Sequence, residues 1–148
     1  MKRLLLLTLI FILAACSAGG SELSRSQKKW QDANITHYRM QLSIGCFCAF
    51  RSQMPLTVEV RDGQIVSMLT ADGAEVLDTD ANYEFFAPRA TVDLLFAEIE
   101  KAVSDGAEVV TVTYDETYGF PAEIAIDISQ QMADEEMYYS ITSFEALQ

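Results

Sequence analysis

The sequence predicts an α+β fold: a single two-layer domain in which an antiparallel β-sheet of about six strands packs against two helices, in the order α-β-β-β-α-β-β-β. Six segments either alternate apolar and polar residues or are rich in β-branched and aromatic residues, as strands are. Two further segments carry apolar residues at helical spacing. Strands with one apolar face and helices with one apolar stripe bury these surfaces against each other in two layers.

The first helix is predicted to begin at Ser24, because a hydroxyl at that position and Gln27 three residues later form a capping box. The helix continues to about Asn34, and Trp30 is expected to dock it on the sheet. The next segment alternates strictly and is a half-buried strand. Its core face is expected to carry Tyr38, Met40, Leu42, Ile44, Cys46 and Cys48.

A hairpin is predicted at residues 56–69, because Asp62-Gly63 supplies the positive φ that a tight turn requires. Two registers stay open. A two-residue turn pairs Val60 with Ile65, whereas a three-residue loop with a bulge pairs Val58 with Val66.

Residues 70–90 are polar and irregular, and this is long for a connection inside a compact domain. The segment is therefore expected to be mobile or functional. Residues 78–84 begin like a calcium-binding loop, but Tyr83 stands where glycine is needed and Arg89 where a bidentate Glu belongs. No metal site is predicted.

The second helix is predicted from Thr91 to Gly106, with Asp93 in its first turn and glycine as its stop. Its apolar stripe consists of Val92, Leu95, Phe96, Ile99 and Val103. Three strands rich in β-branched or aromatic residues follow, at residues 108–114, 122–128 and 137–144.

The chain begins like the precursor of a bacterial lipoprotein. Met1-Lys2-Arg3 is basic, and residues 4–13 form an apolar run that is too short to span a bilayer but suits a secretory signal. The quartet Leu13-Ala14-Ala15-Cys16 resembles the lipobox, after which the cysteine becomes a lipid-modified N-terminus. We expect residues 1–15 to be removed and Cys16 to carry the lipid. An ordinary signal peptide cut nearby, with Cys16 incidental, is the alternative.

Two or three acyl chains at Cys16 would anchor the protein durably to a membrane. Ser17 follows, and by resemblance to lipoproteins of two-membrane bacteria this implies the periplasmic side of the outer membrane. In a one-membrane bacterium the same signal leaves the protein on the outer face of the plasma membrane. The domain is extracytoplasmic in both cases, so its cysteines meet an oxidising compartment.

The mature chain divides into a tether and one domain. Residues 16–23 comprise the lipidated cysteine and a small, polar stretch typical of a flexible spacer, and residues 24–148 form the domain. Loss of the leader lowers the formal net charge from −12 to −14. Such a chain repels nucleic acid and anionic lipid, so its complementary partners are cations or basic proteins. Acidity that merely keeps the protein soluble is the alternative.

Cys46 and Cys48 leave three alternatives open: a small-ring disulfide, two inert thiols, or a redox or metal role. Residues two apart in a regular strand have Cβ atoms roughly 6 to 7 Å apart, whereas a disulfide needs about 3.8 Å. A bridge therefore requires a bend, which Gly45 can supply. A closed thiolate site needs four ligands, and besides these cysteines the domain offers only His37, on the opposite face of the strand. We predict the disulfide.

No catalytic motif is found: the chain has no Gly-x-Ser-x-Gly, no His-Glu-x-x-His and no phosphate-binding loop. No enzyme activity, catalytic residue or cofactor is predicted.

The turn at residues 115–121 is the most distinctive local string. Asp115 and Glu116 bring negative charge to it, while Tyr118 and Phe120 bring aromatic rings that must either fold back or be presented to a partner. We take these four residues as the candidate binding surface. The alternative is that Phe120 enters the core and Tyr118 packs on the sheet.

Several marks spread along the mature chain resemble an uncharacterised family of bacterial lipoproteins and secreted proteins, defined as a domain of unknown function. They are Trp30, Tyr38-Arg39, Cys46-Phe47-Cys48, Val60-Arg61-Asp62-Gly63, Thr91 to Phe96, Tyr114-Asp115, Gly119-Phe120-Pro121 and Asp127. The resemblance implies a single domain in a lipoprotein or secreted setting, and it brings no activity, cofactor or binding residue.

Two functions of different class are therefore expected. The first is a non-catalytic binding or scaffolding lipoprotein of the cell envelope, whose partner is another envelope protein. The second is an acidic, inhibitor-like module that binds a basic extracellular enzyme such as a lysozyme.

Overall fold

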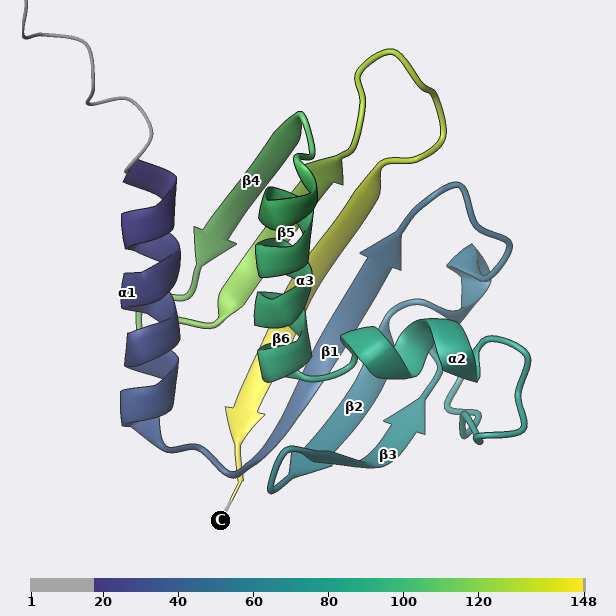
Figure 1. Ribbon diagram of the computed structural model, residues 1–148. Coiled ribbons are helices and arrows are strands. Elements are labelled where there is room, and N and C mark those ends of the chain that lie inside the picture. Colours follow the sequence, from purple (N-terminus) through teal and green to yellow (C-terminus); the bar gives the residue numbers. More distant parts are fainter. Residues whose placement is uncertain (1–17, 148) are drawn as a thin grey trace, which may run out of the picture.

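The computed structural model describes residues 18–147. The expected signal peptide and the lipid site at Cys16 lie outside the described residues. These residues contain three α-helices and six strands, counted over 18–147 only (Figure 1). They are α1 (Ala18–Ala33), β1 (His37–Gly45), β2 (Leu56–Arg61), β3 (Gln64–Leu69), α2 (Tyr83–Phe86), α3 (Val92–Asp105), β4 (Val109–Tyr114), β5 (Pro121–Asp127) and β6 (Met137–Ala146), with short 3-10 helices at Arg51–Gln53 and Ala87–Arg89.

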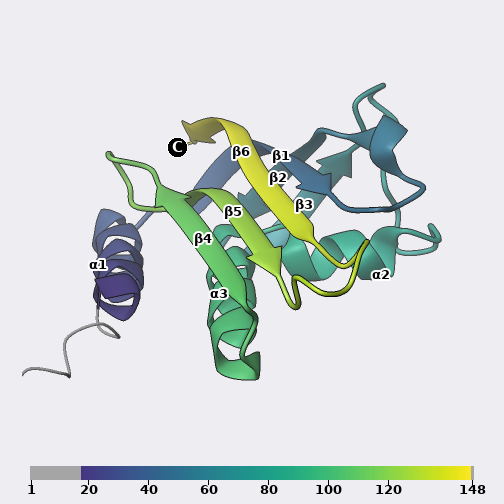
Figure 2. The same ribbon diagram turned by 90° about the horizontal axis from the view of Figure 1, so that it is seen from above.

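The six strands form one sheet in the order β3-β2-β1-β6-β5-β4, and every neighbouring pair is antiparallel. The helices lie on one face of this sheet and leave the other face open (Figure 2). The predicted α+β class and the single two-layer domain are confirmed. The expected number of helices is wrong by one, because α2 forms inside the segment that was expected to be irregular.

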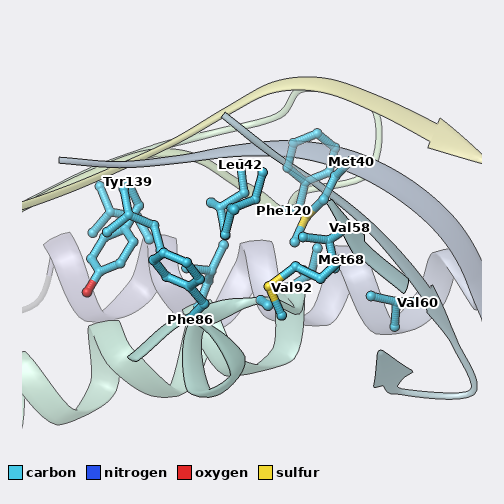
Figure 3. Close-up of a cluster of buried hydrophobic side chains, with 14 of the residues drawn as sticks. Met40, Leu42, Val58, Val60, Met68, Phe86, Val92, Phe120 and Tyr139 are labelled. Carbon is cyan, nitrogen blue, oxygen red and sulfur yellow. The ribbon is translucent and has the colours of Figure 1, made fainter. Parts of the chain in front are cut away.

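The core lies between the sheet and the helices, where the labelled side chains of Figure 3 fill the space between the two layers. The predicted alternation of β1 is confirmed, since Tyr38, Met40, Leu42 and Ile44 are all buried. Side chains of β2, β3, α2 and α3 meet them. Complete burial of each aliphatic side chain contributes about 1.5–3 kcal/mol.

Helix α1 begins at Ala18, not at Ser24, so the predicted flexible spacer is wrong for residues 18–23. The longer helix has a physical reason in its packing. Leu23, Ser26 and Trp30 lie on one helical face, and all three are wholly or partly buried. Contacts of this face stabilise turns that the local capping signal does not include. The helix ends as predicted, beside Asn34 in the left-handed region at φ 48°.

Trp30 docks α1 as predicted. Its indole Nε1 donates a 3.0 Å hydrogen bond to Asp93 Oδ1 on α3. Its ring lies edge-on to Tyr38 and Phe144, with centroids 5.5 and 5.9 Å away. Such edge-to-face pairs contribute about 0.5–1.5 kcal/mol beyond the area that they bury.

The β2–β3 hairpin has the two-residue turn. Val60 pairs with Ile65, and Asp62 and Gly63 have φ of 50° and 74°. Both central residues have positive φ, as in the turn type whose twist matches that of the flanking strands. A bulge then places Val58 opposite Met68, so the alternative pairing of Val58 with Val66 is wrong.

The segment at residues 70–90 is held to the domain, not loose. Phe86 of α2 is fully buried. Arg89 Nε donates a 3.1 Å hydrogen bond to Tyr139 Oη, which donates to Glu98 Oε1 at 3.1 Å. The Arg89 guanidinium also lies 4.3 Å from the centre of the Phe85 ring. The segment covers the core beneath β1 to β3.

Helix α3 has the predicted ends. Thr91 Oγ1 accepts a 3.2 Å hydrogen bond from Leu94 N, and Gly106 has φ of 80°. The apolar stripe is buried at Val92 through Ile99, but Val103 is 59% exposed. The buried stripe is therefore one turn shorter than predicted.

The buried tyrosines of the core should make the folding stability of the protein fall at alkaline pH. Tyr38 Oη accepts a 2.9 Å hydrogen bond from Val92 N, and burial raises the pKa of Tyr38. Burial, with the nearby Glu98 carboxylate, raises the pKa of Tyr139 to about 12. A raised pKa in the folded state means that the associated stability is complete below the unfolded value of about 10 and is lost as the pH rises through the folded values.

Tyr38→Phe is expected to lower the free energy of unfolding at pH 7 by about 1–3 kcal/mol, because it leaves the buried Val92 N–H without an acceptor. The variant should also lose stability less steeply above pH 10 than the parent does. Urea unfolding at pH 7 and in a series up to pH 12 measures both effects. Tyr138→Phe, at a position 55% exposed, is the control at pH 7. An unchanged alkaline slope in Tyr38→Phe would contradict the assignment.

Candidate interaction surface

The cysteine pair forms a disulfide immediately after β1. The strand ends at Gly45, the chain turns, and the Cα atoms of Cys46 and Cys48 lie 5.2 Å apart, closer than the roughly 6.6 Å of a regular strand. The predicted bend and the disulfide alternative are both present. Both cysteines pack against the core, whereas Phe47 between them is 82% exposed.

For protein taken from an oxidising compartment and handled without reductant, we expect the peptide that contains Cys46 and Cys48 to be two hydrogens lighter than the dithiol. Mass spectrometry of the alkylated and digested protein measures this difference. Two thiols that react with the alkylating reagent under these conditions would disprove the pair.

The turn at residues 115–121 is built by its own hydrogen bonds. Asp115 Oδ1 accepts from Thr117 N at 3.0 Å and from Tyr118 N at 2.6 Å. The backbone N–H of Asp115 donates to Phe120 O at 2.8 Å, and that of Gly119 donates to Asp115 O at 2.9 Å. The Asp115 carboxylate therefore holds the turn together, as aspartate often does.

Phe120 is not an exposed anchor. The residue is 5% exposed and stacks on Phe144 at a centroid distance of 4.6 Å. Trp30 of α1 completes its surroundings at 6.4 Å. The expectation that Phe120 meets a partner is wrong. Burial of its apolar ring between α1 and β6 is more favourable than exposure of the ring to water.

The rest of the turn holds α1. Lys29 Nζ donates a hydrogen bond to Glu116 O, and Gly119 passes so close to the helix that a Cβ atom there would lie 2.7 Å from Ser26 O. Tyr118 is half-buried against Phe144. The four residues predicted as a binding surface thus build the contact between α1 and the sheet.

The open face of the sheet has two different halves. On β1 and β2, His37 Nε2 lies 2.8 Å from Glu59 Oε1, and Arg39 Nη2 donates a 2.8 Å hydrogen bond to Glu59 Oε2. The hydrogen bond from Arg39, followed by that from His37, lowers the pKa of Glu59. His37 lies on the face that the sequence predicted. Charges in this half are paired with one another.

The other half, on β4 to β6, carries hydroxyl groups and one exposed aromatic ring. A shallow pocket of about 260 Å³ lies there, lined chiefly by Thr111, Thr113, Glu123, Ala125, Tyr138 and Ser140. Tyr138 is 55% exposed. Its side chain lies over Gly45, where an added Cβ would be 3.3 Å from Tyr138 Cβ. The pocket is therefore open to a partner from the solvent side.

Charge is distributed very unevenly along the chain. Residues 102–148 contain ten Asp and Glu residues and no Lys, Arg or His, so all the basic residues precede β4. Among the described residues, two buried carboxylate oxygens, Asp127 Oδ1 and Glu135 Oε1, have no hydrogen-bond partner. The half of the sheet formed by β4 to β6 therefore carries acidic side chains and no basic ones of its own, although Glu145 of β6 lies 3.9 Å from Arg39 of β1. A separate charge count for the two parts of the sequence would have found it.

Four exposed apolar residues lie at one end of this half. Tyr138 of β6 pairs with Gly45, the last residue of β1, so Phe47 and Tyr138 lie at the same end of the sheet. Ile128 and Met132, which are 54% and 55% exposed, follow the end of β5 in the loop at the top of Figure 1. We call these four residues the apolar end.

Two further observations concern metals and membranes. Within residues 18–147, no three His, Cys, Asp or Glu side chains are grouped as ligands for a metal ion. In the same part of the chain, no helix has the length and apolar character needed to cross a bilayer.

Comparison with known proteins identifies one similarity. The model of DUF6174, described as a family of unknown function, matches residues 22–146. No curated protein and no solved structure shows a significant match.

Proposed function

We propose that this chain, which belongs to the DUF6174 family, is a lipid-anchored and non-catalytic binding protein of the bacterial cell envelope. The anchor is supported by the basic start, the short apolar run and the Leu13-Ala14-Ala15-Cys16 quartet. Acyl chains on Cys16 would hold the domain at the outer membrane, facing the periplasm, or on the outer face of a single membrane.

The observation that carries the binding role is the apolar end on an acidic half-sheet. Phe47 is 82% exposed and is held by the disulfide on either side of it, so little conformational entropy is lost when it is buried by a partner. Tyr138, at the same end, adds a second aromatic ring. Exposed aromatic anchors surrounded by charge are typical of protein interfaces.

The position of the single histidine supports a non-catalytic role. His37 lies at the start of β1, at the opposite end of the strand from Phe47. Its imidazole is hydrogen-bonded to Glu59, which also binds Arg39. His37 therefore belongs to a hydrogen-bonded group built on the Arg39–Glu59 ion pair, away from the surface proposed to bind.

The charge distribution favours a second, narrower function. An acidic module without cations in its last 47 residues is complementary to a basic protein, and a basic extracellular enzyme such as a lysozyme would fit. In that case the chain is an inhibitor-like module and the same surface makes the contact. Binding should then weaken steeply with salt, because charges are screened within about 10 Å at 0.1 M.

Crosslinking in intact cells, followed by purification of the lipidated protein, tests the binding role. The double variant Phe47→Ser, Tyr138→Ala should lose the crosslinked partner. Val66→Ser, which replaces another exposed apolar residue, 51% exposed, should retain it. Equal capture by both variants would remove the apolar end as the contact surface.

The anchor has its own test. Cys16→Ser should give an uncleaved or soluble product that does not label with a palmitate analogue. Undiminished labelling would rule out Cys16 as the lipid site.

A further inference from the structure

The two edges of the sheet differ in how their backbone groups are paired. The outer edge of β3 is partly covered, because Leu69 pairs with Glu75 in an isolated bridge and Val76 N donates to Met68 O at 2.8 Å. Strand β4 is the other edge. Among the described residues, the backbone hydrogen bonds of Val109 to Tyr114 go to β5 alone.

The register identifies the groups on the free edge. Glu108 N donates to Ile128 O, and the regular pairing continues through Val110 opposite Ile126 and Val112 opposite Ile124. Bonded and non-bonded pairs alternate in an antiparallel ladder. The backbone N–H and C=O groups of Val109, Thr111 and Thr113 therefore point away from β5, and none of them has another backbone hydrogen-bond partner among the described residues.

The composition of β4 does nothing to protect this edge. Its sequence, Val-Val-Thr-Val-Thr-Tyr, has high strand propensity and contains no charge, proline or glycine. Folded proteins usually protect an exposed edge with lysine, proline or a bulge, and here the one bulge lies at the far end, beside Tyr114. An edge of this kind is a template for another strand.

We propose that β4 binds an extended, basic segment of the partner protein, which adds to the sheet as a seventh, antiparallel strand. The inference rests on the proposed function and adds the mode of binding and the chemistry of the partner. Glu108 and Asp115 border β4 along the chain. On β5, Glu123 and Asp127 lie opposite Thr113 and Val109, on the open face.

The geometry explains why the added strand would be basic. Successive strands are about 4.8 Å apart, so the added strand lies about 10 Å from β5, within reach of a long Lys or Arg side chain across Thr111 and Thr113. Glu123, which is exposed and lies opposite Thr113, supplies a carboxylate there.

A second copy of the chain is the less favourable occupant. Pairing of β4 with the β4 of another copy would bring together two regions that each carry ten carboxylates and no cation between residues 102 and 148. Like charges across such an interface oppose association. A cationic segment is attracted by the same charges.

The test uses three synthetic peptides of alternating Lys and Val, seven residues long, with lysine at both ends. One is unmodified, one is N-methylated on its internal lysine amides, and one is N-methylated on its valine amides. In antiparallel addition, the amides that face β4 belong to residues whose side chains lie on the open face, so these are the lysines. Methylation of the lysine amides should weaken binding by at least about tenfold, and methylation of the valine amides should not.

Binding is measured by fluorescence anisotropy with the purified domain, and hydrogen exchange should slow at the amides of Val109, Thr111 and Thr113 on binding. Thr111→Pro removes one outward N–H without removing a bond to β5 and should lower the affinity for the unmodified peptide, whereas Thr111→Ala should not. If Thr111→Pro does not fold, the comparison of the two methylated peptides still tests strand addition.

Equal binding of the two methylated peptides would show that charge attraction alone holds them, and it would overturn strand addition. A failure of all three peptides to bind would also overturn it. A dimer that depends on β4 would assign the edge to a second copy and overturn it as well. The proposed function is judged separately. A cellular partner that is lost with the Phe47 and Tyr138 double variant but kept by Thr111→Pro would leave that function standing and reject strand addition.

Discussion

Phe120→Ala is expected to lower the free energy of unfolding by about 3–5 kcal/mol, the range for an aromatic ring removed from a core. The ring is 5% exposed and fills the space between Trp30 of α1 and Phe144 of β6. Its loss would open a cavity at the contact through which α1 is held. The melting temperature should fall sharply, and α1 should become the first element to exchange its amide hydrogens.

Tyr118→Ala is the matched control for Phe120→Ala, because it removes a neighbouring ring that is only half-buried. Its cost should be less than half as large. Urea unfolding followed by circular dichroism measures both variants. A change within about half a kcal/mol for Phe120→Ala would place the ring at the surface and restore the turn as a binding site.

Gly119→Ala is expected to have the second large effect, about 2–5 kcal/mol, from two causes that add. Gly119 has φ of 82°, in a region that costs an alanine about 1–2 kcal/mol. A Cβ atom there would also lie 2.7 Å from Ser26 O and 2.9 Å from Lys29 Cβ, so α1 would have to move, and overpacking of this kind costs about 1–3 kcal/mol.

Gly63→Ala separates the two causes. Gly63 has φ of 74°, but an added Cβ there would meet no atom within 4 Å, so only the backbone cost of about 1–2 kcal/mol is expected. Trp30, the one tryptophan, reports the position of α1 through its fluorescence. Equal losses in the two variants, with unchanged Trp30 emission, would show that the turn does not support α1.

The contact with α1 explains why the turn at residues 115–121 is so distinctive in the sequence. Its aspartate, glycine and aromatic residues are needed to seat α1 against the sheet. The proposed binding surface lies at the opposite end of β5, where Ile128 and Tyr138 are exposed. A partner can therefore bind there without disturbing the α1 contact.

Local patterns in the sequence were sufficient for much of the fold. The alternation of Tyr38, Met40, Leu42 and Ile44 determined a buried strand face, because strand side chains have a period of two. Thr91 and Gly106 determined the ends of α3, because capping depends on residues within one turn. Gly45 and the two cysteines after it indicated a bend, because the disulfide is impossible without one.

Only the tertiary structure decided how distant segments meet. The start of α1 at Ala18 depends on contacts that Leu23 and Trp30 make with the core, so the nearby capping box misplaces it. Phe120 is buried because Phe144 and α1 enclose it, and it lies in the turn before β5, where no strand periodicity applies. Phe47 and Tyr138 share one end because β1 pairs with β6, a contact between strands far apart in the chain. Local propensity acts over one turn or a few residues, whereas burial depends on which elements pack together, and the order β3-β2-β1-β6-β5-β4 is set by that packing.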